Sequence, residues 1–233
     1  MCLLVVRKAG SWKPTKEEFS NAWRINSDGF GLAYASGGKL KISKSLTEKV
    51  AWDSIQRIPD NVPALLHWRM GTHGSATLNN VHPFTLPKVS DKRTAWVGAH
   101  NGVFSNIKPE GDITDSEAYF RTIKKISVQS IEEDIQRLGY GKVALLNNEG
   151  KLLIANEGQG SWRTPEVWQS NCNLDSAAYW SGIGFGREYR QRTGSRDLVP
   201  LDCHSCGSRE VSYRSGRNTF LCEVCADWSD YVA

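Results

Sequence analysis

Cys2, the second residue of the chain, combines two groups that could act together in catalysis. Removal of an initiator methionine generally requires a small second residue, and cysteine qualifies. Cys2 would then carry a thiol nucleophile and a free α-amine, which titrates near about 7.7–8.0 and can act as a base at neutral pH. The alternative is a structural cysteine packed beside Leu3 and Leu4. Its position alone leaves both roles open.

Four further cysteines form two CxxC pairs near the C-terminus: Cys203, Cys206, Cys222 and Cys225. Fifteen residues separate the pairs, a spacing typical of zinc sites. Two turns that each present two thiolates can surround one Zn²⁺ tetrahedrally and leave no open position for catalysis. The pattern therefore predicts one structural zinc in a small ribbon over residues 200–233, with a hairpin of 211–213 and 219–221. Unmetallated cysteines are the alternative.

Polar motifs in between could bind a charged substrate. Arg69, at the end of an expected strand, could grip a carboxylate with two parallel hydrogen bonds, or form a surface ion pair. Asn101-Gly102 either forms a hairpin turn or presents a side-chain amide beside a backbone N–H, the two donors of an oxyanion hole. Asp115, at an expected helix start, is either an N-cap or a ligand for an ammonium group. Three nearby histidines have structural roles as their simplest explanation: His73, His82 and His100.

Secondary-structure elements must position these side chains. Short apolar, β-branched runs predict strands, while a capping box and helical periodicity predict helices. Strands are expected at residues 2–6, 30–35, 39–43, 64–69, 95–100, 142–146, 152–156 and 166–169. Helices are expected at residues 15–25, 47–58, 116–126 and 130–138. Strand pairs followed by helix pairs favour a layered α/β sandwich over a strict βαβ repeat.

Length and composition suit one folded domain with a small appendage. The chain has 233 residues, 39% hydrophobic and 23% charged, which is enough to bury a core. A net charge of +4 is too small to argue for nucleic acid. No run approaches the ~18 apolar residues that cross a bilayer, and no basic segment precedes the short apolar run at the start. We therefore expect a cytoplasmic protein with no secretory signal and no membrane contact.

The order of these motifs resembles the class II glutamine amidotransferases, of the N-terminal-nucleophile hydrolase superfamily. The shared segments are residues 1–2, 26–31, 67–74, 79–84, 100–102 and 114–117. The resemblance implies a four-layer αββα sandwich over residues 2–182, with Cys2 at the start of a central strand. Residues 183–199, rich in glycine and arginine, would link it to the zinc ribbon. One departure is Met70, where relatives carry a tryptophan.

The resemblance also implies the reaction, which is hydrolysis of the side-chain amide of glutamine to glutamate and ammonia. Cys2 would attack the amide carbon and form a glutamyl thioester, with its α-amine moving the proton and no cofactor required. The Asn101 side chain and the Gly102 N–H would hold the oxyanion. Arg69 would bind the α-carboxylate of glutamine and Asp115 its α-ammonium. Two further residues would line the same pocket: Thr72 and His73.

The ammonia needs an acceptor. The residues after the resemblance are too few for a second synthetic domain, so we expect a separate synthetase to receive it. One alternative is a stand-alone hydrolase of γ-glutamyl amides. Another is a silent amidotransferase fold whose ribbon binds nucleic acid or protein, although the complete set of expected catalytic groups argues against silence. From residue 187 onward seven arginines are balanced by seven acidic residues, which weakens the nucleic-acid alternative.

Overall fold

The structure of the chain is a computed structural model. It describes residues 2–71, 74–91, 93–174, 212–214 and 219–221. By their internal contacts the residues divide into two units, Met1–Ser170 and Asn171–Ala233.

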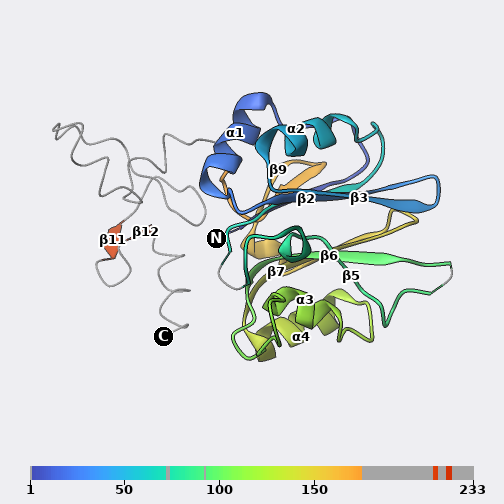
Figure 1. The fold of residues 1–233 in the computed structure, drawn as a ribbon, viewed down its shortest axis with the longest axis vertical. Coiled ribbons are helices and arrows are strands. Elements are labelled where there is room, and N and C mark those ends of the chain that lie inside the picture. Colours follow the sequence, from blue (N-terminus) through green and yellow to red (C-terminus); the bar gives the residue numbers. More distant parts are fainter. Residues whose placement is uncertain (1, 72–73, 92, 175–211, 215–218, 222–233) are drawn as a thin grey trace. The chain divides into compact units, whose positions relative to one another are not determined.

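The described part of the first unit contains two antiparallel sheets (Figure 1). The larger sheet has, in spatial order, β3 (Lys39–Ser45), β2 (Phe30–Ser36), β4 (Ala64–Trp68), β1 (Leu3–Arg7), β10 (Val167–Gln169) and β9 (Ser161–Thr164). The smaller sheet has β5 (Phe84–Thr85), β6 (Trp96–Val103), β7 (Tyr140–Asn147) and β8 (Leu152–Ala155). Strand β1 lies between β4 and β10 and all five of its residues are buried. Cys2 directly precedes this central strand.

Helices lie on the outer sides of the two sheets. Figure 1 shows α1 (Lys16–Ile25) and α2 (Glu48–Gln56) beside the larger sheet, and α3 (Asp115–Phe120) and α4 (Val128–Leu138) beside the smaller one. Two short 3₁₀ helices occur at η1 (Leu78–Asn80) and η2 (Glu157–Gln159). The expected capping box starts α1, because Thr15 accepts from the Glu18 N–H while the Glu18 carboxylate accepts from the Thr15 N–H.

Apolar side chains join the two sheets face to face. One buried cluster takes residues from both: Leu4, Val6, Ala33, Ala35, Leu65, Val97, Ala99, Ala144, Leu146 and Trp168. Side chains alternate along a strand, so Cys2 continues the inward face of Leu4, and Asn101 continues the inward face of Ala99. The alternation therefore directs the nucleophile candidate and the expected oxyanion amide toward the same layer between the sheets. A second cluster, with Phe104, Tyr119 and Phe120, packs the smaller sheet against its helices.

The mixed α/β class predicted from the sequence is confirmed, with some local differences. Asn101-Gly102 lies inside β6 and does not form a hairpin turn. The helix expected to reach residue 126 ends at Phe120, because the N–H and hydroxyl of Thr122 both donate to the Tyr119 carbonyl and close a tighter turn. Strands β5 and β9 were not predicted from the sequence; they are too short to show alternation and form by pairing with β6 and β10.

In the second unit the predicted hairpin is confirmed. Strand β11 (Ser212–Arg214) pairs antiparallel with β12 (Thr219–Leu221), with Tyr213 opposite Phe220. The expected linker at residues 183–199 and the four expected zinc ligands lie outside the described residues: Cys203, Cys206, Cys222 and Cys225.

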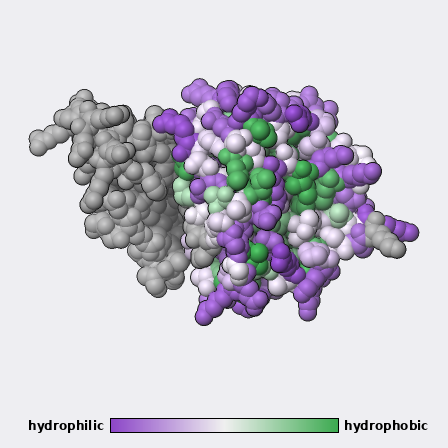
Figure 2. Space-filling view, viewed as in Figure 1, coloured by the Kyte–Doolittle hydropathy of each residue, from purple (hydrophilic) through white to green (hydrophobic). Residues whose placement is uncertain are grey.

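The face of the first unit seen in Figure 2 is mostly hydrophilic, with small hydrophobic patches between its two helical sides. The larger exposed apolar side chains among the described residues include Ile42, Leu46, Val50 and Leu78. None of the helices that the structure describes combines the length and apolar character required to traverse a membrane.

Candidate active site

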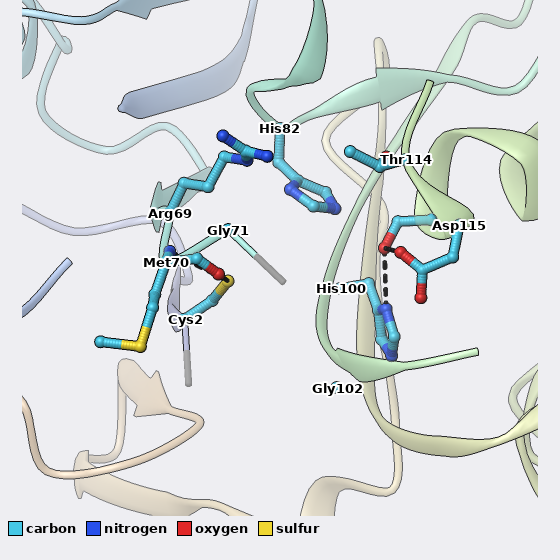
Figure 3. A pocket seen from close by; sticks show the side chains of 10 residues that line it. Cys2, Arg69, Met70, Gly71, His82, His100, Gly102, Thr114 and Asp115 are labelled. Atoms are coloured by element: carbon cyan, nitrogen blue, oxygen red, sulfur yellow. Dashed lines mark hydrogen bonds between the residues drawn. The ribbon is translucent and has the colours of Figure 1, made fainter. Parts of the chain in front are cut away.

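A pocket lies beside Cys2, between the two sheets and the start of α3 (Figure 3). Its walls come from segments far apart in the chain: Cys2, Arg69, Met70, Gly71, His82, His100, Gly102, Thr114, Asp115 and Ser116. The structure thus brings together four of the predicted site residues, Cys2, Arg69, Gly102 and Asp115. Thr72 and His73, also predicted to line this pocket, lie outside the described residues.

Strand register places Cys2 next to the arginine. Leu3 of β1 pairs with Trp68 of β4, so the residues that follow outward along the ladder are Cys2 and Arg69. The Met70 N–H donates to the Cys2 sulfur at 3.3 Å, and the thiol donates to the Met70 carbonyl at 3.3 Å. Burial raises the pKa of the Cys2 thiol, although the Met70 hydrogen bond and the charge of Arg69 oppose the change. At neutral pH the thiol is therefore protonated, and nucleophilic attack requires a base.

Arg69 is buried in the segment that follows β4. Its guanidinium Nη2 donates to the Gly74 carbonyl at 2.9 Å, and the side chain is 2% exposed. A Cβ at Gly71 would lie 2.9 Å from the same nitrogen, so a side chain at this position would require the guanidinium to shift. Asp28 accepts the Gly71 N–H at 2.7 Å and so ties the segment after β4 to the expected segment 26–31.

The end of β6 forms the wall on the other sheet. Gly102 lines the pocket, and a Cβ there would lie 2.1 Å from the Tyr140 carbonyl oxygen. Asn101, also expected at the oxyanion, is buried, and its side-chain Nδ2 lies 2.7 Å from Ser170 Oγ. Ser170 was not predicted as a site residue, because a serine after a short strand carries no signal in the sequence.

Asp115 is the first residue of α3, and Thr114 rather than Asp115 is its N-cap. The Asp115 Oδ2 atom accepts the Phe104 N–H at 2.7 Å, and the side chain is buried. Figure 3 shows Asp115 and Arg69 on opposite sides of the pocket, with Cys2 on the arginine side. The pocket therefore carries one cationic and one anionic group at separate positions.

Two buried histidines, His82 and His100, line the pocket, and a third, His67, contacts both of them. The His67 ring nitrogen Nε2 donates to the His100 carbonyl at 3.0 Å, and the His67 and His82 rings lie 4.1 Å apart. His100 Nδ1 lies 2.9 Å from Ser116 Oγ. Burial lowers the pKa of His67 to about 3 and that of His100 to about 4, and it holds the pKa of His82 well below 6.5. All three rings are neutral at pH 7, which fits the structural roles expected for His82 and His100.

The sequence did not single out His67, whose hydrogen bond to the other sheet depends on tertiary packing. Among the described residues, no group of three or more His, Cys, Asp or Glu side chains is arranged to hold a metal ion. The described pocket thus contains the Cys2 thiol, the backbone of Gly102 and the oppositely charged side chains of Arg69 and Asp115.

Comparisons with known proteins identify the family and the fold. A family model described as "Glutamine amidotransferases class-II" matches residues 18–158. A search of curated proteins finds no match.

Two solved structures show a similar fold. The glutamine phosphoribosylpyrophosphate amidotransferase from B. subtilis, complexed with ADP and GMP, superposes with a TM-score of 0.51 at 16% identity, over 76% of this chain and 44% of that chain. A structure described as the allosteric regulatory enzyme of purine biosynthesis gives 0.52 at 15% identity, over 76% and 43%. The chain therefore matches less than half the length of either enzyme. Because the family model covers more than half of its residues, the chain belongs to the class II glutamine amidotransferases.

Proposed function

We propose that the chain is a glutaminase that hydrolyses the side-chain amide of glutamine through Cys2. The observation that carries the proposal is the convergence of Cys2, Arg69, Gly102 and Asp115 on one pocket. Removal of Met1 would make Cys2 an N-terminal nucleophile, and the two sheets with their helices would form the four-layer αββα sandwich of such hydrolases. Each group that amide hydrolysis requires then has a candidate in this chain.

The charges of the pocket support a free amino acid as substrate. Arg69 would bind the α-carboxylate of glutamine, and Asp115 would bind its α-ammonium group. A glutamine inside a peptide has neither charge on its α-carbon, so the site would discriminate against it. Thr72 and His73 would complete the same binding site.

The chemistry then follows from the part-buried, protonated thiol of Cys2. The α-amine of processed Cys2 takes the thiol proton, and the sulfur attacks the amide carbon of glutamine. The Asn101 amide and the Gly102 N–H stabilise the oxyanion. The C–N bond breaks and ammonia leaves with the proton from the amine. Water then hydrolyses the thioester, which releases glutamate and restores the thiol.

We further propose that the ammonia passes to a separate synthetase, and that the enzyme works in the cytoplasm. Residues 200–233 would form a ribbon with one Zn²⁺ bound by Cys203, Cys206, Cys222 and Cys225. Four thiolates suit Zn²⁺, and the β11–β12 pairing supports a hairpin between the two CxxC turns. The ribbon would serve as a docking module or a structural cap, and residues 183–199 as its linker.

Mass spectrometry with a diazo-ketone analogue of glutamine tests the central proposal. We expect one adduct on a chain that begins at Cys2, and none on the Cys2→Ala variant or on a chain that retains Met1, because the retained residue converts the amine into an amide. The processed chain should likewise release ammonia from free glutamine, and neither the Cys2→Ala variant nor the chain that retains Met1 should do so. A processed chain that neither reacts nor releases ammonia would refute the proposal. Faster release from γ-glutamyl peptides than from glutamine would instead identify γ-glutamyl amides as the substrates.

A further inference from the structure

A buried polar bridge joins the two sheets close to the nucleophile. Ser170 follows β10 and is 1% exposed. Its Oγ accepts the Leu4 N–H at 2.9 Å, and its own N–H donates to the Leu4 carbonyl at 2.8 Å. Two hydrogen bonds to Leu4 therefore fix Ser170 to the strand that begins just after Cys2. The same Oγ lies 2.7 Å from Asn101 Nδ2 on the facing sheet.

This bridge differs from its apolar surroundings. The neighbouring contacts between the sheets are made by side chains such as Leu4, Ala99 and Ala144. A polar group in such a layer is costly unless its hydrogen bonds are satisfied. Among the described residues, Asn101 Oδ1 is buried and has no hydrogen-bond partner. In this orientation the amide gives one N–H to Ser170 and leaves its oxygen unsatisfied.

Rotation of the Asn101 amide by half a turn gives the unsatisfied oxygen a donor, because it brings Oδ1 to the Ser170 hydroxyl. A hydroxyl can accept one hydrogen bond and donate another. Ser170 then keeps the bond from the Leu4 N–H and donates its own hydrogen to Asn101 Oδ1. The amide nitrogen moves to the position that no described side chain or backbone group satisfies. Both N–H groups of that nitrogen are then without a partner among the described residues.

We propose that Ser170 is a positioning residue that orients the Asn101 amide as an oxyanion donor. Its hydroxyl selects the orientation with the oxygen toward Ser170 and the N–H groups toward the substrate. Its bonds to Leu4 also fix the distance between the strand of the nucleophile and the strand of the donor. The inference rests on the glutaminase function proposed above, because only a developing oxyanion requires this donor.

Steady-state hydrolysis of glutamine by the processed full chain tests the role of Ser170. Loss of one oxyanion donor lowers the rate on the order of 10²–10³-fold, which is the expected effect of Asn101→Ala. Ser170→Ala leaves the amide in place but unoriented, so we expect kcat to fall roughly 10-fold or more, with KM little changed. Ser170→Thr keeps the hydroxyl and should restore most of kcat. Ser54→Ala is the matched control, because it removes another buried hydroxyl, one that bonds to Ala51 within α2.

A double-mutant cycle separates orientation from packing. If Ser170 acts through Asn101, Ser170→Ala adds little to the loss in an Asn101→Ala background. If the two substitutions lower kcat additively, or if Ser170→Ala leaves kcat unchanged, the inference is overturned. The glutaminase activity of the unsubstituted chain would be unaffected by either result. If Ser170→Ala does not fold, Ser170→Cys takes its place, because a thiol is similar in size to the hydroxyl but is a weaker donor. We expect the same loss of kcat in Ser170→Cys, and a normal kcat in this variant overturns the inference. An unsubstituted processed chain that releases no ammonia would refute the proposed function itself, and with it this role of Ser170.

Discussion

Gly102 has no room for a side chain, because backbone surrounds it on the side where a Cβ would lie. A Cβ would approach the Tyr140 carbonyl oxygen to 2.1 Å and the Gly141 Cα to 2.5 Å. Neither atom belongs to a flexible side chain, so β6 or β7 would have to shift. The glycine that the sequence marked as a donor therefore also sets the separation of two strands at the pocket.

Gly102→Ala should lower kcat for glutamine at least 10-fold, because a shift of β6 displaces the oxyanion donors. It should also lower the melting temperature by several degrees. Gly158→Ala is the control, since nothing lies within 4 Å of the Cβ it would add. Thermal melts and ammonia release check both effects. A Gly102→Ala enzyme with normal kcat would contradict the assignment of this strand end to the oxyanion site.

Asp115 is the second residue whose charge the proposal requires. Asp115→Asn keeps the acceptor for the Phe104 N–H, so the fold should persist while the negative charge is lost. A hydrogen bond to a charged group contributes about 1.5–3 kcal/mol, so KM for glutamine should rise roughly 10- to 100-fold. Asp134→Asn on α4, which breaks the ion pair with Arg137 instead, should leave KM unchanged. An unaltered KM in Asp115→Asn would remove Asp115 from the binding site.

At the scale of elements, two polar contacts cross between the sheets at the end of β6. His67 of β4 donates to the His100 carbonyl, and Ser170 after β10 meets the Asn101 side chain. Away from this end, apolar side chains such as Val6, Val97 and Leu146 pack between the sheets. Hydrogen bonds are directional, whereas apolar packing allows small sliding, so these contacts place β6 relative to the strand that follows Cys2.

A buried arginine fixes the other end of β1. Arg7 donates to the carbonyls of Trp12, Pro59 and Val62 at 3.0, 2.7 and 2.7 Å. Arg7→Met should lower the free energy of unfolding by about 2–4 kcal/mol, because three carbonyls lose their donors. Arg24→Met, at an exposed position on α1, should change it by less than about 0.5 kcal/mol. Urea unfolding monitored by tryptophan fluorescence measures the free energy of unfolding of both variants. If Arg7→Met is as stable as Arg24→Met, water replaces the guanidinium.

At the scale of the whole molecule, the buried histidines make stability depend on pH. Burial lowers the pKa of His67 to about 3 and that of His100 to about 4, whereas an unfolded histidine titrates near 6.5. Below pH ~6.5 the unfolded chain therefore binds more protons than the folded chain. The neutral rings therefore make their full contribution to the free energy of unfolding above about pH 6.5, and this contribution is lost as the pH falls toward 4.

Each of these histidines should lower the free energy of unfolding by about 2 kcal/mol at pH 5 relative to neutral pH. His67→Gln retains a donor for the His100 carbonyl but does not titrate. The loss of stability between pH 7 and pH 5 should therefore be about 2 kcal/mol smaller in this variant than in the unsubstituted chain. Urea unfolding at the two pH values decides the matter. Identical losses in both proteins would mean that His67 is not buried in its neutral form.

The proposed zinc ribbon also belongs to this scale, because metal binding would supply most of its folding energy. Native mass spectrometry should find one zinc ion per chain, and Cys203→Ser should remove it or weaken its binding strongly. Cys172→Ser, outside the CxxC pairs, should retain the metal. A chain without zinc at neutral pH, or equal zinc content in both variants, would contradict the ribbon.

Much of the fold and part of the site could be predicted from local patterns. The short apolar run in Leu3–Arg7 and the capping box at Thr15 are properties of adjacent residues, and the corresponding elements formed. The motifs around Cys2, Arg69, Gly102 and Asp115 identified pocket residues, because the residue types themselves carry the chemistry. The spacing of the CxxC pairs likewise defines a donor set without reference to the rest of the chain.

Only the tertiary structure decided which distant groups meet. Asn101-Gly102 is a turn by local preference, yet pairing with β7 keeps it extended within β6. Ser170 lies 69 residues from Asn101 along the chain, and packing of two sheets brings them together. Such contacts depend on strand register and on sheet packing, which no local pattern encodes. The sequence by itself thus determined the chemical groups and most elements, and tertiary packing decided how those groups face the substrate.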